Sequence, residues 1–316
     1  MHESAPVIQM SKSMRNTPKK SATTLHVHEA DTLLSFLLKK MGGMSRTSAK
    51  QLLSQRRVSV DGHIETRHDV MLQAGQTVEI RSGMPSAELN HPKLRIVWED
   101  EHLIVVEKRE GLLTVATHPG STETTVFSIL KSYIRRSNPR GGIYTVHRLD
   151  RETSGLLVFA KDKQLQEYMR EWWKDLVSRR TYVAVAEGIM QQRSGTIRTW
   201  LTEDKRQAVV YSSPVDDGGK LSVTHYKVIA TSSPDSEQRY SLLELNLETG
   251  RTNQIRVHLA SVGHPVVGDR KYGSGKPTPL DRLALHARVL EFTHPVTEQV
   301  LHFETDIPKG FTALLK

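Results

Sequence analysis

The stretch 145-TVHRLDRETSGLLVFAKD-162 places a single carboxylate among bases and follows it with an apolar run. Asp150 is the acid, and His147, Arg148 and Arg151 are its neighbours. The apolar run 155–161 predicts a buried strand, which would hold the acid in a fixed position. Nearby positive charge keeps a carboxylate ionised, and such a group can act as a nucleophile or a base. A structural ion pair explains the same pattern, and the residues alone do not decide between the two.

Strand patterns outnumber helix patterns on either side of this stretch. Strands are expected at 94–99, 103–108, 155–161, 181–188, 221–230, 241–247, 284–292 and 300–304. Helices are expected at 124–136, 164–173 and 252–262, the last ended by Gly263 at its C′ position. Because strands and helices do not alternate strictly, residues 93–316 are predicted to form an α+β domain with a mostly antiparallel mixed sheet.

Composition narrows the class of protein. The chain has 316 residues, 37% of them hydrophobic, which is enough for one large domain or a large and a small one. Lys and Arg number 44 against 35 acids, and the net charge of +9 favours an anionic partner such as nucleic acid. Cysteine is absent, which excludes disulfides and fits a cytoplasmic location. No apolar run approaches the roughly 18 residues that span a bilayer, so no membrane partner is expected.

A small basic α/β unit is expected at residues 31–83. The patterns predict a helix over 33–38 with Asp31 as N-cap, a second helix after Ser45, a hairpin turn at Asp61-Gly62 and a last strand at 77–80. Six bases and no acid lie in its middle, a bias typical of a phosphate-contacting face: Lys39, Lys40, Arg46, Lys50, Arg56 and Arg57.

The run 45-SRTSAKQLLSQRRVSVDG-62 within this unit resembles the α-L RNA-binding domain. That resemblance implies RNA binding by the N-terminal unit. Residues 1–30 are expected to be a disordered basic tail. Residues 84–92 carry two prolines and little apolar content, and they are predicted to be a linker.

Three patterns that suggest other functions are incomplete. The run HRLD, together with the strand at 103–108, is similar to parts of protein kinases, but a Gly-rich phosphate loop and an Asp-Phe-Gly run are missing. The run 268-GDRKYGSGKP-277 lacks the Lys-Ser/Thr that closes a Walker pattern, so it predicts a polar loop. The 15 histidines show no HExxH spacing, so no metal site is predicted.

Four motifs, in order along the chain, resemble those of the RluA-type pseudouridine synthases. The first is the run HRLDRETSGLLVFAKD, and the others are 180-RTYVAVAEG-188, 250-GRTNQIRVHLASVGHPVVGD-269 and 282-RLALHA-287. Four motifs in the family's order do not arise by chance. Together with the N-terminal unit, the resemblance extends from residue 31 to the C-terminus. It implies the pseudouridine synthase fold.

The chain departs from the family pattern at two positions. Arg180 stands where the family usually has Lys, and Asn253 stands where it usually has His. Asn keeps a donor and an acceptor but cannot be protonated. The substitution bears on details of RNA contact rather than on the chemistry, because the neighbouring Arg256 is retained.

The resemblance implies an enzyme that detaches uracil from its ribose, rotates it and rejoins it through a ring carbon, with no cofactor or metal. The target base must be flipped out of the RNA. Asp150 would be the essential carboxylate, either by adding to the sugar carbon or by removing a sugar proton. Arg256 would hold that carboxylate bidentately in its ionised state. Tyr182 would stack on the flipped base and remove its ring proton.

The other candidate residues are assigned to substrate contact. Leu285, with Leu283 as a second choice, would pack on the other face of the uracil, and Arg148 would fill the gap that the flipped base leaves. On composition alone the leucines would be core residues and the arginine a phosphate contact. The RNA-contacting set is completed by His147, Asn253, Arg251, Arg46, Lys50, Arg56 and Arg57.

Large-subunit ribosomal RNA is the expected substrate, because related enzymes with this N-terminal unit mostly act there, and transfer RNA is the second choice. A non-catalytic RNA-binding or ribosome-assembly protein is the alternative from another class, but it has no need of Asp150, Tyr182 and Arg256 together. An RNA hydrolase is a weaker third interpretation, which predicts strand cleavage. A monomer is the expected oligomeric state.

Overall fold

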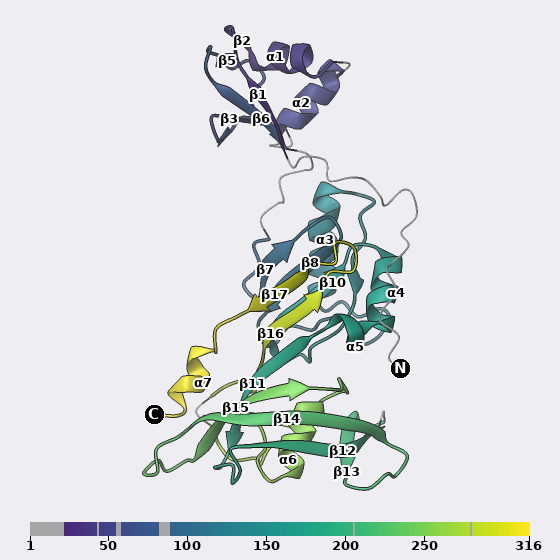
Figure 1. Ribbon diagram of the computed structural model, residues 1–316, viewed down its shortest axis with the longest axis vertical. Helices are drawn as coiled ribbons and strands as arrows, with labels where there is room; N and C mark the ends of the chain where they lie inside the picture. Colours follow the sequence, from purple (N-terminus) through teal and green to yellow (C-terminus); the bar gives the residue numbers. More distant parts are fainter. Residues whose placement is uncertain (1–21, 43, 55–57, 82–88, 205, 279) are drawn as a thin grey trace. The chain divides into compact units, whose positions relative to one another are not determined.

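The computed structural model describes residues 22–42, 44–54, 58–81, 89–204, 206–278 and 280–316. These residues divide into two compact units. One holds the described residues up to 89 together with 132–141, and the other holds residues 90–131 and 142–316. Figure 1 follows the chain through both units.

Two helices and two small antiparallel sheets make up most of the N-terminal unit. One sheet has the strand order β1-β6-β3-β4, and the other pairs β2 with β5. Apolar side chains of both helices and of three strands form its core. The elements are β1 (Ala22–His26), β2 (Asp31–Thr32), α1 (Leu33–Lys40), α2 (Arg46–Ser54), β3 (Val58–Val60), β4 (His63–Ile64), β5 (Met71–Leu72) and β6 (Thr77–Arg81).

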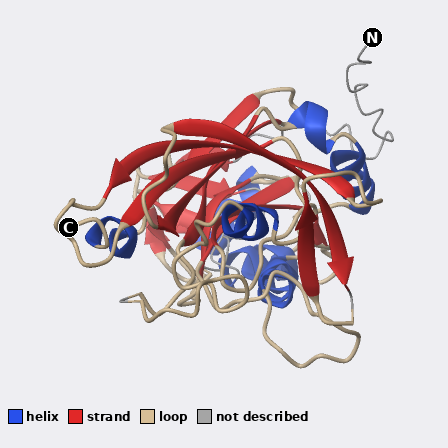
Figure 2. Cartoon of the chain, turned by 90° about the horizontal axis from the view of Figure 1, so that it is seen from below, coloured by secondary structure: helices blue, strands red, loops and turns tan. Residues whose placement is uncertain are grey.

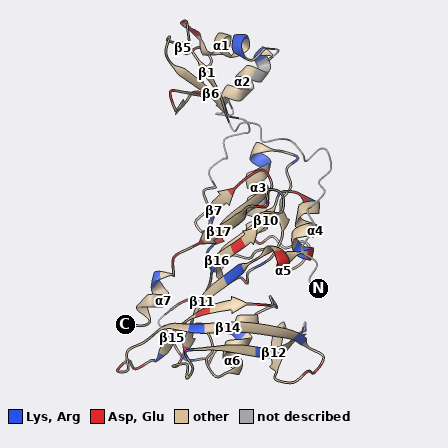
Figure 3. Cartoon of the chain, in the orientation of Figure 1, with Lys and Arg blue, Asp and Glu red and all other residues tan. Residues whose placement is uncertain are grey.

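The first helix begins as predicted but with a different cap. The side chain of Thr32 accepts a hydrogen bond from the backbone N–H of Ser35, so Thr32 is the N-cap of α1. Asp31, the predicted cap, instead forms an ion pair with Lys39 at 2.8 Å. That pair neutralises one of the two lysines that end α1. Figure 3 colours the basic and acidic residues along the chain.

Of two predictions for this unit, the hairpin turn is confirmed and the disordered tail is wrong in part. The predicted hairpin at Asp61-Gly62 is confirmed, because both residues have the positive φ that its turn requires, 50° and 82°. The disordered tail predicted for residues 1–30 is wrong over Ala22–His26, where β1 pairs with β6 along five residues. The rest of that tail up to residue 21, and most of the predicted linker, lie outside the described residues.

The second unit is built on one eleven-stranded sheet, which is twisted and curved (Figure 2). Its strand order is β13-β12-β14-β15-β11-β16-β10-β8-β7, with β17 beside β16 and β9 beside β10. Among its described strand pairs, β10 with β16 is parallel and the others are antiparallel. The predicted α+β fold with a mostly antiparallel mixed sheet is therefore confirmed.

The elements of this unit follow the predicted order, with additional strands. The strands are β7 (Leu94–Glu99), β8 (Leu103–Lys108), β9 (Tyr144–Thr145), β10 (Ser154–Ala160), β11 (Arg179–Glu187), β12 (Ser194–Asp204), β13 (Val209–Ser213), β14 (Lys220–Thr231), β15 (Tyr240–Leu247), β16 (Leu285–Thr293) and β17 (Val300–Glu304). The helices are α4 (Lys163–Glu171), α5 (Trp173–Leu176), α6 (Gln254–Ser261) and α7 (Lys309–Ala313), together with α3 (Val126–Ser137), which belongs to this unit up to Lys131.

Two apolar cores hold helices against this sheet. Leu165 and Met169 of α4 pack in one core with β8 and β10, and Ile255 and Leu259 of α6 pack in the other with β11 and β15. Strand β10 is buried along its whole length, as its apolar run predicts. Among the described residues, no helix is both long and apolar enough to cross a membrane.

Gly155 fixes how the strand that follows Asp150 meets β16. Its φ is +118°, and a Cβ atom would lie 2.2 Å from the carbonyl oxygen of Ala287. Another residue would therefore force the two strands apart. Ala287 pairs with Gly155 on one side and with Tyr182 on the other. This register brings the region of Asp150 and the middle of β11 to the same part of the sheet.

Candidate active site

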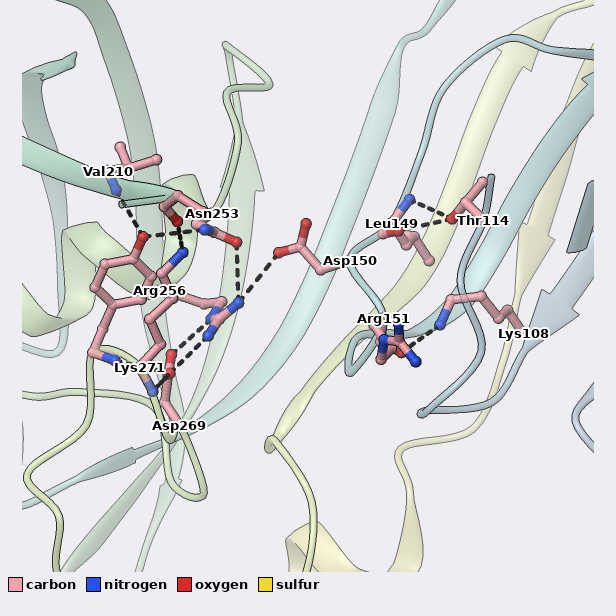
Figure 4. Close-up of polar contacts among 12 residues, drawn as sticks. Lys108, Thr114, Leu149, Asp150, Arg151, Val210, Asn253, Arg256, Asp269 and Lys271 are labelled. Carbon is pink, nitrogen blue, oxygen red and sulfur yellow. Dashed lines mark hydrogen bonds and ion pairs between the residues drawn. The ribbon is translucent and has the colours of Figure 1, made fainter. Parts of the chain in front are cut away.

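The turn that carries Asp150 is fixed through its backbone (Figure 4). The Thr114 hydroxyl donates to the carbonyl of Leu149 at 2.7 Å and accepts from its N–H at 3.2 Å. The Lys108 amine donates to the carbonyl of Arg151 at 2.9 Å. Lys108 is fully buried at the end of β8, and burial lowers its pKa to about 7. The residues on both sides of Asp150 are thus anchored to the body of the unit.

The cation beside Asp150 comes from α6 rather than from its sequence neighbours. Nη1 of Arg256 lies 3.6 Å from Oδ2 of Asp150, and the two side chains are 12% and 29% exposed (Figure 4). Arg151 is paired instead with Glu123 at 2.8 Å, and Arg148 is exposed. An Asp150 carboxylate that remains partly open to solvent beside a mostly buried guanidinium is accessible to a substrate.

Arg256 is held bidentately by Asp269 and not by Asp150, the partner that the motifs predict. Its Nε and Nη2 donate to the two carboxylate oxygens of Asp269 at 2.7 and 2.8 Å. Burial alone would raise the pKa of Asp269, but the hydrogen bonds and charge of Arg256 outweigh it and hold that pKa below its usual range. Asp269 therefore fixes the plane of the guanidinium, and the remaining nitrogen, Nη1, faces Asp150.

Asn253 also orients Arg256. Its Oδ1 accepts a hydrogen bond from Nη1 of Arg256 at 3.0 Å, and its Nδ2 donates to the hydroxyl of Tyr272 at 3.1 Å. Its φ of 54° is left-handed, a conformation that Asn adopts more readily than most residues. Both ends of the predicted RNA-contacting amide are thus engaged within the protein.

Tyr182 and Leu285 line a cavity of about 70 Å³ together with Asp150. An adjoining cavity of about 500 Å³ shares Asp150 and Tyr182 with it. Burial raises the pKa of Tyr182, with Arg180 opposing and Asp150 adding to that shift, so the phenol is protonated at neutral pH. The second predicted leucine, Leu283, is 2% exposed and lies in the core without lining either cavity.

The predicted RNA-contacting residues fall into three groups. Arg148 and Arg251 are exposed and line both cavities, while Arg46 and Lys50 are exposed on α2 of the N-terminal unit. His147 lines the larger cavity, but its Nε2 accepts the N–H of Val158 at 3.2 Å and so ties the Asp150 segment to β10. The last two, Arg56 and Arg57, lie outside the described residues.

Two residues that orient the site are missed by the sequence interpretation. Asp269 and Tyr272 lie in the run 268–277, which the sequence analysis interprets as a polar loop. The signal that could identify Asp269 is the same as for Asp150, an acid directly followed by bases. Its partner could not be identified in this way, because the pairing with α6 depends on how the chain folds back.

We expect Asp269→Asn to lower the free energy of unfolding by about 3 kcal/mol, because it leaves the buried guanidinium of Arg256 without its charged partner. Glu123→Gln is the matched control, since it removes one carboxylate charge from a half-exposed ion pair and should cost less than about 1 kcal/mol. Urea denaturation of both variants measures the difference. Equal small losses would show that the Arg256–Asp269 pair does not organise the site.

Comparisons with known proteins identify the family that the chain resembles. The family model described as RNA pseudouridylate synthase matches residues 102–261, the segment that holds Asp150, Tyr182 and Arg256. The uncharacterized RNA pseudouridine synthase YhcT of Bacillus subtilis is 34% identical, over 86% of this chain and 88% of the relative. The ribosomal large subunit pseudouridine synthase D of Nitrosomonas europaea is 35% identical, over 86% of this chain and 80% of the relative.

A solved structure shares the fold. Human RNA Pseudouridylate Synthase Domain Containing 1 matches with a TM-score of 0.55 and 27% identity, over 71% of this chain and 87% of that one. The ordered motifs, the sheet and the relatives agree, and this chain therefore belongs to the RNA pseudouridylate synthase family, as an RluA-type enzyme that isomerises uridine in RNA.

Proposed function

We propose that this enzyme modifies one or more uridines of large-subunit ribosomal RNA, with Asp150 as the essential carboxylate. The observation that carries the proposal is the Asp150–Arg256 pair at 3.6 Å, in a cavity that Tyr182 and Leu285 also line. The choice of RNA is supported by relatives named ribosomal large subunit pseudouridine synthase D, at 35% identity in Nitrosomonas europaea and 33% in Escherichia coli O6:H1.

In this proposal the target uridine leaves the RNA stack and enters the cavity between Tyr182 and Leu285. Its sugar then faces the Asp150 carboxylate, which either adds to the sugar carbon or removes a sugar proton. Arg256 stabilises the ionised carboxylate at the start of the reaction. Once the base is rejoined through its ring carbon, the protonated phenol of Tyr182 gives its proton to the freed ring nitrogen, and its oxygen then takes the proton from that carbon.

The substrate is tested by mapping pseudouridines across the transcriptome, by carbodiimide labelling, with and without the gene. We expect at least one site in large-subunit ribosomal RNA to be lost in the deletion and regained when the gene is restored. A lost site in transfer RNA alone would contradict the proposed substrate. The absence of any lost site would contradict the proposed function in the cell that was mapped.

We propose that Arg148 fills the space that the flipped base leaves. It is exposed, lines both cavities, and is joined to Asp150 through Leu149, whose backbone Thr114 fixes. Base flipping costs a few kcal/mol of stacking and pairing. Loss of the Arg148 side chain should therefore slow the reaction most in paired RNA.

Arg148→Ala should therefore slow the modification of a paired stem-loop at least about tenfold more than that of an unpaired RNA. Arg148→Lys should restore little, because an ammonium group cannot stack as a plane. Single-turnover rates on matched substrates measure both effects. Equal slowing on the two RNAs, with rescue by Lys, would show that Arg148 is only a phosphate contact.

We also propose that the N-terminal unit is an α-L RNA-binding domain. Arg46 and Lys50 are exposed four residues apart on α2, so they share a face of the helix. Their joint replacement by Ala should flatten the salt dependence of RNA binding, with the slope falling by about 0.7–0.9 for each phosphate that the protein no longer neutralises. Lys39→Ala is the control, because Asp31 already neutralises that lysine. An unchanged slope in the double variant would refute the proposed RNA-binding role of this helix face.

A further inference from the structure

The larger cavity is lined by cations that have no acidic partner. These cations are Arg148, Arg170, Lys174, Arg180 and Arg251, and none of them lies within 4 Å of a carboxylate among the described residues. Elsewhere in the site, by contrast, Arg151 and Arg256 are paired with acids. The cavity also holds the acids Asp150, Glu171 and Glu248. Unpaired cations gathered around a cavity favour an anionic ligand, and in RNA the anionic group is the phosphodiester.

Arg180 differs from the other four because the protein fixes where its guanidinium lies. Its Cζ is 5.9 Å from the ring centroid of Trp173, the first residue of α5, and the Trp173 ring in turn lies 4.8 Å from that of His147. Burial and the nearby Arg180 charge lower the pKa of His147 to about 3, so that ring is neutral and does not repel the guanidinium. A guanidinium against an aromatic ring keeps its N–H groups free for a phosphate.

Gly250 provides the space for this guanidinium on its other side. A Cβ atom at Gly250 would lie 3.0 Å from Nη1 and 3.2 Å from Nη2 of Arg180. The φ of Gly250 lies outside the left-handed region, so its backbone conformation does not require glycine. Close approach to Arg180 is therefore the physical reason for glycine at this position.

The loop around Gly250 has little freedom to move away. The buried side chain of Gln254 accepts hydrogen bonds from the hydroxyl of Thr249 at 2.8 Å and from the N–H of Arg251 at 3.0 Å. Its amide donates to the carbonyl of Val223 at 2.9 Å. An added methyl group at Gly250 must therefore displace the flexible end of Arg180 rather than the backbone.

We propose that Arg180 binds a phosphodiester of the RNA beside the flipped uridine, and that Trp173 and Gly250 are positioning residues for its guanidinium. Arg180 and Tyr182 both line the larger cavity, so this phosphate lies close to the target base. A guanidinium offers a phosphate two parallel hydrogen bonds, which fix orientation as well as adding affinity. The inference rests on the proposed function, in which this cavity receives the RNA.

The test is the salt dependence of RNA affinity, measured at equilibrium with a stem-loop substrate. Arg180→Ala should weaken binding about tenfold at low salt, which is typical when a hydrogen bond to a charged group is removed. It should also lower the slope of log K against log salt concentration by about 0.7–0.9. Arg180→Gln, which keeps part of the side-chain length and removes the charge, is a second variant with the same expected slope.

Arg179→Ala is the matched control, because it removes the same charge from the neighbouring residue of β11. The Nε of Arg179 donates to the hydroxyl of Thr181 at 3.2 Å, and Arg179 lines neither of the two cavities. For Arg179→Ala, the slope of log K against log salt concentration should equal that of the wild type. Equal slopes for all three arginine variants and the wild type would overturn the phosphate contact.

A double-mutant cycle tests the role of Gly250. Gly250→Ala should weaken binding about threefold in the wild type and not at all in the Arg180→Ala background, because its effect acts through the guanidinium. The same loss in both backgrounds would overturn that role. The assay measures RNA affinity and not the reaction rate, so its result does not depend on whether Asp150 is the catalytic carboxylate. That assignment is tested separately, and it is wrong if Asp150→Asn remains active.

Discussion

Asp150→Asn is expected to lower the single-turnover rate of pseudouridine formation by at least about 10⁴-fold, as for other residues that act as part of a catalytic unit. The change keeps the shape of the side chain and removes its charge. Asp150 makes one ion pair, at 3.6 Å, and is partly exposed, while its backbone is held by Thr114 and Lys108 on either side. The variant should therefore fold and bind RNA almost as the wild type does.

Glu152→Gln is the matched control for this prediction. Glu152 lies in the same turn, is exposed, and loses the same charge in the same way. Its rate should stay within about twofold of the wild type, as expected for an exposed side chain outside the catalytic unit. If Asp150→Asn retained a rate within about tenfold, or about 1.4 kcal/mol in the barrier, Asp150 would not be the reactive group.

Tyr182→Phe should slow the reaction by about 10²–10⁴-fold, the range typical of a lost proton-transfer group, with little change in RNA affinity. The ring that lines the cavity is kept, so stacking on the base is kept as well. The variant lacks only the hydroxyl, which burial holds in its protonated form. The measurement is the single-turnover rate at saturating enzyme, together with the dissociation constant.

Tyr226→Phe, on β14, is the control for loss of a phenol hydroxyl outside the site. Its rate should match that of the wild type. If Tyr182→Phe also matched the wild type, Tyr182 would act as a stacking surface alone. If it lost affinity while the rate at saturating enzyme stayed unchanged, the hydroxyl would contribute to binding rather than to the chemical step.

The strands buried on both faces are among those that could be predicted from sequence. The runs at 103–108 and 155–161 are apolar because β8 and β10 lie inside the sheet, and the structure places them within one residue of the prediction. Strands β12 and β13 are missed; β13 is at one edge of the sheet, and β12 lies between β13 and β14. Along β12 only Ile197 and Leu201 are buried, a spacing of four that gives no alternating pattern.

The sequence predicts which residues form the candidate site, but not which of them contact one another. The motifs identify Asp150, Tyr182 and Arg256, and the structure places all three around one pair of cavities. Arg256 does pair with Asp150, but the bidentate bond is wrongly predicted for that pair, because Arg256 forms it with Asp269, on a loop that follows its helix. Local charge was also misleading, since Arg151 lies next to Asp150 in sequence and yet is paired with Glu123.

The central claim is that the carboxylate of Asp150 carries out pseudouridine formation. The most direct test uses RNA purified from cells that lack the gene, incubated with purified wild type, Glu152→Gln or Asp150→Asn, and mapped for pseudouridine at single-nucleotide resolution. We predict that wild type and Glu152→Gln restore the same site or sites in large-subunit ribosomal RNA, and that Asp150→Asn restores none. Restoration of those sites by folded Asp150→Asn protein would contradict the account.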